Sequence, residues 1–107
     1  MNTTERIRQK NIHQFRQRER VVFDAIPGMK ELLQAESEED FTALQAMYPD
    51  ASFALMTASN LFCKDRELND IHLRAYQSIL DGTPIAHVRY RYDYDLEAYL
   101  ERHLWDD

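Results

Sequence analysis

A chain of 107 residues, 44% hydrophobic and 30% charged, has the size and composition of a folded domain and not those of a disordered segment. Its net charge of −6 argues against a protein that coats nucleic acid over its whole surface. The single cysteine, Cys63, excludes an intrachain disulfide and a zinc site made of several thiolates. We therefore expect one domain over residues 1–107, in the reducing setting of the cytoplasm, without a cofactor.

Basic side chains are concentrated at the N-terminus. Residues 1–20 contain six basic and two acidic side chains, a net charge of +4, whereas residues 21–107 contain seven basic and seventeen acidic ones, a net charge of −10. The basic side chains could bind nucleic acid or an acidic partner, or the acidic remainder of the chain could balance them, which is the interpretation we favour. They are Arg6, Arg8, Lys10, Arg16, Arg18 and Arg20.

A long first helix is predicted from a cap near Asn2 to Ile26. It ends there because Pro27 disfavours helical geometry in the residue before it and Gly28 permits a sharp turn. Few apolar residues occur among residues 1–20, so the sequence leaves open whether this part packs on a core or projects as a helical arm.

Two helices are expected next. Residues 29–35 have apolar side chains at helical spacing over about two turns. Ser37, with Asp40 three residues later, resembles a capping box and predicts a further helix, which Pro49 ends.

The most apolar segment covers residues 51–63, and Asp50 can cap it. Its apolar side chains lie on all sides of a helix, and such a helix is normally surrounded by others. Cys63, at its end, is therefore expected to be a small buried hydrophobe and not a nucleophile paired with His72 or His87.

The C-terminal part is predicted to contain two more elements. A charged segment, 64–70, leads into an amphipathic helix that ends at Asp81 and Gly82. Apolar and charged side chains alternate from Val88 to Leu96, which fits a strand, but these residues also fit a helix. On a helix, one face carries Ile85, Val88, Tyr92, Leu96, Tyr99 and Leu100. A lone strand would leave its backbone unpaired, so we favour the helix.

The predicted fold class is all-α. We expect a compact bundle of about five to six helices around the buried helix 51–63, with a long N-terminal helix. The alternative is an α+β fold in which a short strand at about 85–94 pairs between two chains.

Motifs for the common chemistries are missing from the sequence. Two glycines cannot form a phosphate-binding loop or a dinucleotide fingerprint, and the four histidines lack zinc spacing. The segment 65–70 lacks the glycine of a calcium loop, and the longest uncharged stretch, 51–63, is too short to span a membrane. Asp93, Glu97 and Glu101 form a carboxylate row that is expected to be a solvated face. We expect neither an enzyme nor a metal or membrane protein.

The aromatic C-terminal segment is the main candidate site. If it is helical, several polar and aromatic side chains point away from its apolar stripe, and exposed tyrosine and tryptophan are enriched at protein interfaces. These side chains are His87, Tyr90, Tyr94, Glu101 and Trp105. We predict a non-enzymatic interaction or regulatory protein, acting as a homo-oligomer or an adaptor. A nucleic-acid-binding module using residues 1–20 is the alternative, and a small enzyme without a recognisable motif is the third hypothesis.

Overall fold

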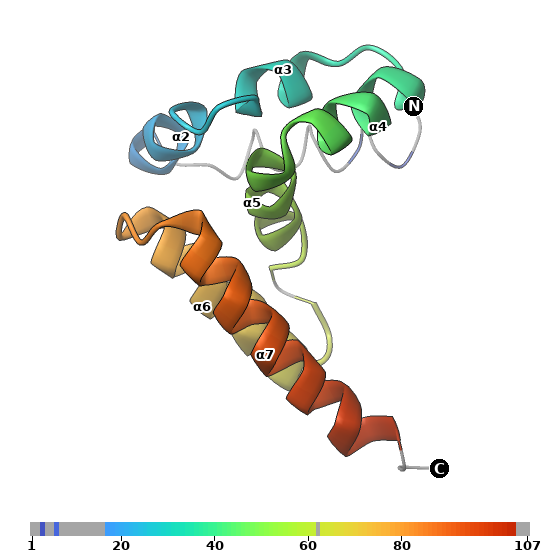
Figure 1. Ribbon diagram of the computed structural model, residues 1–107, viewed down its shortest axis with the longest axis vertical. Coiled ribbons are helices and arrows are strands. Elements are labelled where there is room, and N and C mark those ends of the chain that lie inside the picture. Colours follow the sequence, from blue (N-terminus) through green and yellow to red (C-terminus); the bar gives the residue numbers. More distant parts are fainter. Residues whose placement is uncertain (1–2, 4–5, 7–16, 62, 105–107) are drawn as a thin grey trace. The chain divides into compact units, whose positions relative to one another are not determined.

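The computed structural model describes residues 3, 6, 17–61 and 63–104, and these residues are helical apart from short connections (Figure 1). The helices are α2 (Gln17–Asp24), α3 (Met29–Gln34), α4 (Glu38–Met47), α5 (Pro49–Ser59), α6 (Arg66–Leu80) and α7 (Ile85–Leu104). No strand occurs in this part of the chain, which confirms the all-α prediction.

The chain divides into two compact units, Met1–Ser59 and Asn60–Asp107. The first unit contains α2 to α5, and the second contains α6 and α7. The single domain expected over residues 1–107 stays a prediction.

The long N-terminal helix predicted from the sequence falls mostly outside the described residues. Thr3 and Arg6 have helical conformation and are exposed. The described helix α2 ends at Asp24, close to the predicted end at Ile26. Phe23 is fully buried, so the C-terminal part of this segment is packed.

Gly28 sets the turn between α2 and α3. It adopts a φ of 89° at the N-cap of α3, in the left-handed region that favours glycine. A side chain at this position would overlap the ring of Tyr48. Met29 and Leu32 of the following helix are fully buried, and α3 packs against both α4 and α5.

The predicted capping of α4 is confirmed. Ser37 is the N-cap residue, and its Oγ accepts a hydrogen bond of 3.1 Å from the backbone N–H of Asp40. The helix ends at Met47, and the N–H of its C-cap residue, Tyr48, donates to the carbonyl of Leu44 over 2.8 Å.

The predicted helix 51–63 is shifted toward the N-terminus, because Pro49 both ends α4 and occupies the first position of α5. A proline fits there, since the first helical N–H has no partner within the helix. Asp50 consequently lies in the first turn and does not cap the helix. Ala51 and Ala54 are fully buried, and α3 and α4 both pack on α5, which agrees with an apolar inner helix in this unit.

Cys63 lies outside α5, contrary to expectation. The helix ends at Ser59, and Cys63 is half-buried in the loop that follows. Its N–H donates to Oδ1 of Asn69 over 3.2 Å, and its Sγ lies 3.4 Å from the carbonyl oxygen of Asp65. The backbone N–H of Cys63, which would bond within the helix if α5 were longer, instead donates to the side chain of Asn69 on α6.

In the second unit, α6 and α7 form an antiparallel hairpin (Figure 1). Gly82, with a φ of 86°, closes the end of α6 in a Schellman motif. The N–H of Gly82 donates to Ile79 over 3.1 Å, and that of Thr83 donates to Ser78 over 3.0 Å. The predicted stop at this position is confirmed.

Residues 85–94 are helical, so the alternative of a strand pairing between chains is wrong. The carbonyl of Pro84 accepts from the N–H groups of His87 and Val88, which starts α7. Val88 and Tyr92, four residues apart, are buried, as expected for one face of a helix. The period-two pattern of charges is compatible with this helix because its charged residues fall on exposed sides.

Candidate functional site

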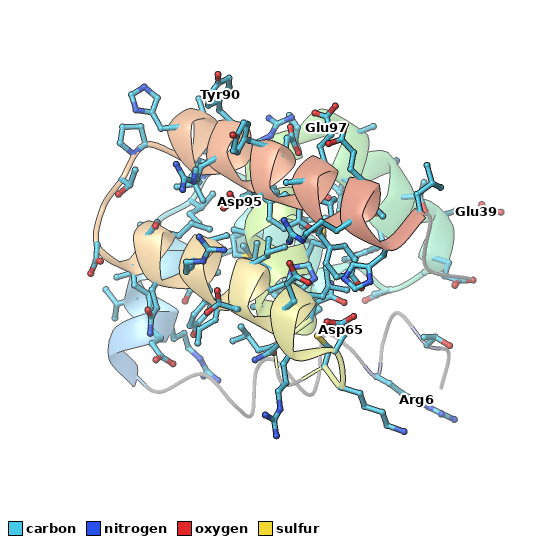
Figure 2. The ribbon with its side chains drawn as sticks, turned by 90° about the horizontal axis from the view of Figure 1, so that it is seen from below. Arg6, Glu39, Asp65, Tyr90, Asp95 and Glu97 are labelled. Carbon is cyan, nitrogen blue, oxygen red and sulfur yellow. The ribbon has the colours of Figure 1, made fainter. Side chains whose placement is uncertain are left out.

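The outer face of α7 carries the predicted interface residues that the structure describes. Tyr90 and Tyr94 are 79% and 63% exposed, and His87 and Glu101 are exposed as well. Their spacing along the helix places all four on one side of it. Figure 2 shows Tyr90 pointing away from α6. Trp105 lies outside the described residues.

The opposite side of α7 packs in the hairpin, with one exception to the predicted stripe. Val88 and Tyr92 are buried, and Leu96 and Tyr99 are half-buried. Leu100 is 55% exposed. Eight residues correspond to about 800° of helix rotation, so Leu100 is turned about 80° away from Tyr92. It joins Leu104, which is 68% exposed, at the margin of the outer face.

A pocket of about 340 Å³ lies between α6 and α7, and its lining includes buried apolar side chains of both helices and two exposed arginines. Nε of Arg74 lies 3.0 Å from Asp70, and its Nη1 lies 3.4 Å from Asp95. Nε of Arg91 lies 3.3 Å from the same carboxylate oxygen of Asp95. Arg74 therefore contacts a carboxylate on each of the two helices, and this network joins α6 to α7.

A second pocket, of about 490 Å³, lies between α3 and α4. Its carboxylates, Glu31, Glu36 and Asp40, are exposed to solvent. This arrangement resembles a solvated acidic surface and provides no chemistry of its own.

A polar cluster closes the other end of the hairpin, where α6 begins and α7 ends. Oδ1 of Asp65 accepts from the N–H of Leu68 over 3.0 Å and caps α6, and its other oxygen accepts from the hydroxyl of Tyr99. Glu67 forms ion-pair contacts with Arg102 and with His103, the latter at 3.0 Å. The rings of Tyr99 and His103 lie 4.3 Å apart between their centroids.

These contacts shift two pKa values in opposite directions. The hydroxyl of Tyr99 and the N–H of Leu68 stabilise the Asp65 carboxylate and lower its pKa from 3.8. The same hydrogen bond to Asp65 raises the pKa of Tyr99 above 10.0. The hydrogen bond that joins the two helices thus has the charged carboxylate of Asp65 as its acceptor and the neutral hydroxyl of Tyr99 as its donor.

Sequence reasoning missed this cluster. From the sequence, Asp65 and Glu67 are only part of the charged segment 64–70 that leads into a helix, and no partner is indicated for His103. In an antiparallel hairpin, residues at equal distances along the chain from the Gly82 turn lie side by side. The start of α6 and the end of α7 are at similar distances from this turn, so a hairpin would have indicated that they pair. The structure shows, in addition, that these residues lie on the sides of α6 and α7 that face each other.

His72 is a buried histidine within the hairpin. It is 4% exposed, and its ring stacks on Tyr92 with centroids 5.5 Å apart. Its Nδ1 has no hydrogen-bond partner in the described part of the protein. Burial disfavours the charged ring and lowers its pKa from 6.5.

The residues considered for metal or acid–base chemistry remain dispersed. No group of three histidine, cysteine or carboxylate side chains gathers around a possible metal position within the residues described. Asp93, Glu97 and Glu101 are exposed on α7, as a solvated carboxylate row should be. Figure 2 shows Glu97 pointing away from α6.

The basic N-terminal segment is described only in part. Arg6 is exposed, Arg18 lies in α2, and Arg20 is exposed. Arg8, Lys10 and Arg16 lie outside the described residues. Contact of this segment with nucleic acid or an acidic partner therefore stays a prediction.

Comparison with models of protein families, with curated proteins and with solved structures finds no match to this chain. None of the described helices has both the length and the apolar composition needed to cross a membrane.

Proposed function

We propose that this chain is a non-enzymatic helical interaction or regulatory protein that associates, with itself or with another protein, through the outer face of α7. The observation that carries the proposal is the exposure of Tyr90 and Tyr94, at 79% and 63%. Tyrosine contributes a large contact area with few rotatable bonds, which makes it a frequent anchor in protein interfaces.

The surroundings of the two tyrosines support an interface of this kind. The guanidinium carbon of Arg91 lies 5.9 Å from the ring centroid of Tyr94, within the range of a cation–π contact that restricts both side chains. Exposed Leu100 and Leu104 continue the apolar character toward the end of the helix. An aromatic centre with polar neighbours is typical of interfaces between proteins that are also stable alone.

Size-exclusion chromatography with light scattering, together with a pull-down from cell extract, tests the proposal. We expect the native chain either to have a mass above the 12.8 kDa of one chain or to recover a partner protein from the extract. Replacing Tyr90 and Tyr94 by alanine should abolish whichever of these two results is seen. Met47→Ala is the matched control, because Met47 is 65% exposed on α4. A monomer with no tyrosine-dependent partner would contradict the proposal.

A further inference from the structure

The outer face of α7 has the spacing of a helix-pairing seam. His87, Tyr94 and Glu101 follow one another at seven-residue intervals, and Tyr90 and Glu97 form a second row with the same interval. Alternating steps of three and four residues keep these positions on one side of the helix, where a second helix can contact them, with the two tyrosines at the centre and polar residues at the ends. A straight helix drifts by only about 20° per seven residues, so both rows stay on one side of α7.

Charge is segregated along this helix. Residues 85–92 contain two arginines and no carboxylate, whereas residues 93–104 contain four carboxylates and one arginine. At the outer face, His87 and Arg91 lie on the N-terminal side of Tyr94, and Glu97 and Glu101 lie on its C-terminal side. Arg91 keeps 71% of its side chain exposed while it contacts Asp95.

We propose that the partner of α7 is a second copy of this chain, bound with the two α7 helices antiparallel and with their tyrosines at the centre. This inference rests on the proposed function and names its partner. An antiparallel copy places the basic half of each helix against the acidic half of the other, whereas a parallel copy opposes like charges. Two-fold symmetry makes each favourable contact occur twice.

The pairing is expected to be weak. One helix face from each chain buries less area than a standard stable interface, so the dimer dissociates in the micromolar range or above. Aromatic pairs between the tyrosines and the opposed helix dipoles contribute to the attraction. Association of this strength responds to protein concentration and to salt.

Charge reversal in two separate chains tests the pairing. H87E with R91E makes both halves of the outer face acidic, and E97K with E101K makes both halves basic. We expect each variant alone to associate at least about tenfold more weakly than the native chain, and an equimolar mixture of the two to recover the native mass. E36K with E39K changes the net charge by the same amount as E97K with E101K, at exposed positions outside α7, and should pair as the native chain does. A mixture that stays monomeric overturns the proposal.

Cysteine cross-linking tests the orientation without altering Arg91, which also contacts Asp95. In a Cys63→Ser background, H87C mixed with E97C or with E101C should form a disulfide dimer. The mixture that cross-links faster shows which of the two positions lies opposite His87 in the pair. H87C alone should not cross-link, because in an antiparallel pair its two copies lie at opposite ends of the contact. Rapid cross-linking of H87C alone indicates parallel helices and overturns the proposal.

The two proposals can fail separately. A native chain that is monomeric at every concentration, yet recovers another protein through Tyr90 and Tyr94, overturns the self-pairing and leaves the proposed function in place. Loss of both self-association and any tyrosine-dependent partner contradicts the proposed function as well.

Discussion

Gly28 and Gly82 have nearly the same backbone conformation but different surroundings. Their φ values are 89° and 86°, so alanine at either position costs about 1–2 kcal/mol of left-handed strain. At Gly28 the new methyl group would also overlap Tyr48, whereas nothing lies within 4 Å of the position that it would take at Gly82. Overpacking of this kind typically costs about 1–3 kcal/mol more.

We therefore predict that Gly28→Ala lowers the free energy of unfolding by about 3 kcal/mol and Gly82→Ala by about 1 kcal/mol. Urea unfolding followed by circular dichroism measures both. Equal losses for the two variants would show that Tyr48 does not restrict the turn at Gly28.

His72 should make the protein less stable in mild acid. Its pKa in the folded protein is lowered from 6.5 by burial, so below pH 6.5 the unfolded chain binds more protons than the folded one. Above about pH 6.5, His72 is neutral in both states and does not reduce the free energy of unfolding. This free energy falls as the pH drops from 6.5 toward the lowered pKa of the folded state.

His72→Phe removes the titrating group and keeps a ring to stack on Tyr92. We expect its thermal midpoint to change less than that of the native chain between neutral pH and about pH 5. Gln77→Ala, at an exposed position of the same helix, is the control and should retain the native pH dependence. An unchanged slope in His72→Phe would be evidence against this explanation.

At the scale of the elements, the hydrogen bond from Tyr99 to Asp65 joins the end of α7 to the start of α6. In an NMR titration of labelled tyrosine rings, Tyr99 and Tyr92 should titrate above 10.0, Tyr99 because of this bond and Tyr92 because of burial. Asp65→Asn should lower the pKa of Tyr99 and leave that of Tyr92 unchanged. A Tyr99 pKa unaffected by this substitution would contradict the contact.

The same aspartate contributes to stability against acid. Because its pKa is lowered in the folded protein, its contribution is present above 3.8 and is lost as the pH falls through the lower folded value. Asparagine caps a helix about as well as aspartate does. Asp65→Asn should therefore keep α6 intact near neutral pH, where Asp65→Ala weakens it, and thermal melts of the two variants separate the cap from the charge.

The sequence predicts helix ends well where the signal is local. Ser37 and Gly82 act within a few residues through side-chain or backbone hydrogen bonds, and both ends are where we expected them. Pro49 is an ambiguous signal, because the same residue can end one helix and begin the next. The position of Cys63 depends on the side chain of Asn69, which the apolar pattern of 51–63 does not reveal.

Contacts between helices could be predicted only in part. The amphipathic pattern of α7 indicated that Tyr90 and Tyr94 are exposed, and the structure agrees. The pairs of Glu67 with Arg102 and of Arg74 with Asp95 join residues distant in sequence. Their partners depend on how the two helices are rotated about their axes, and a hydrophobic pattern fixes this rotation only coarsely.

At the scale of the whole molecule, the uneven charge described from the sequence recurs within one helix. The chain is basic in residues 1–20 and acidic elsewhere, and α7 is basic in its first half and acidic in its second. The N-terminal segment and α7 are thus two parts of the sequence with uneven charge. Association through α7 should depend on its tyrosines and should persist when residues 1–20 are removed.

Photo-cross-linking in cells tests the central claim most directly. A benzophenone amino acid replaces Tyr90 or Tyr94 in the full chain, with the exposed position Thr42 on α4 as the control. We predict that irradiation at either tyrosine position yields a discrete adduct, with a second copy of the chain or with another protein, and that the control position does not. Equal adducts from all three positions, or none from the tyrosine positions, would contradict a binding surface on the outer face of α7.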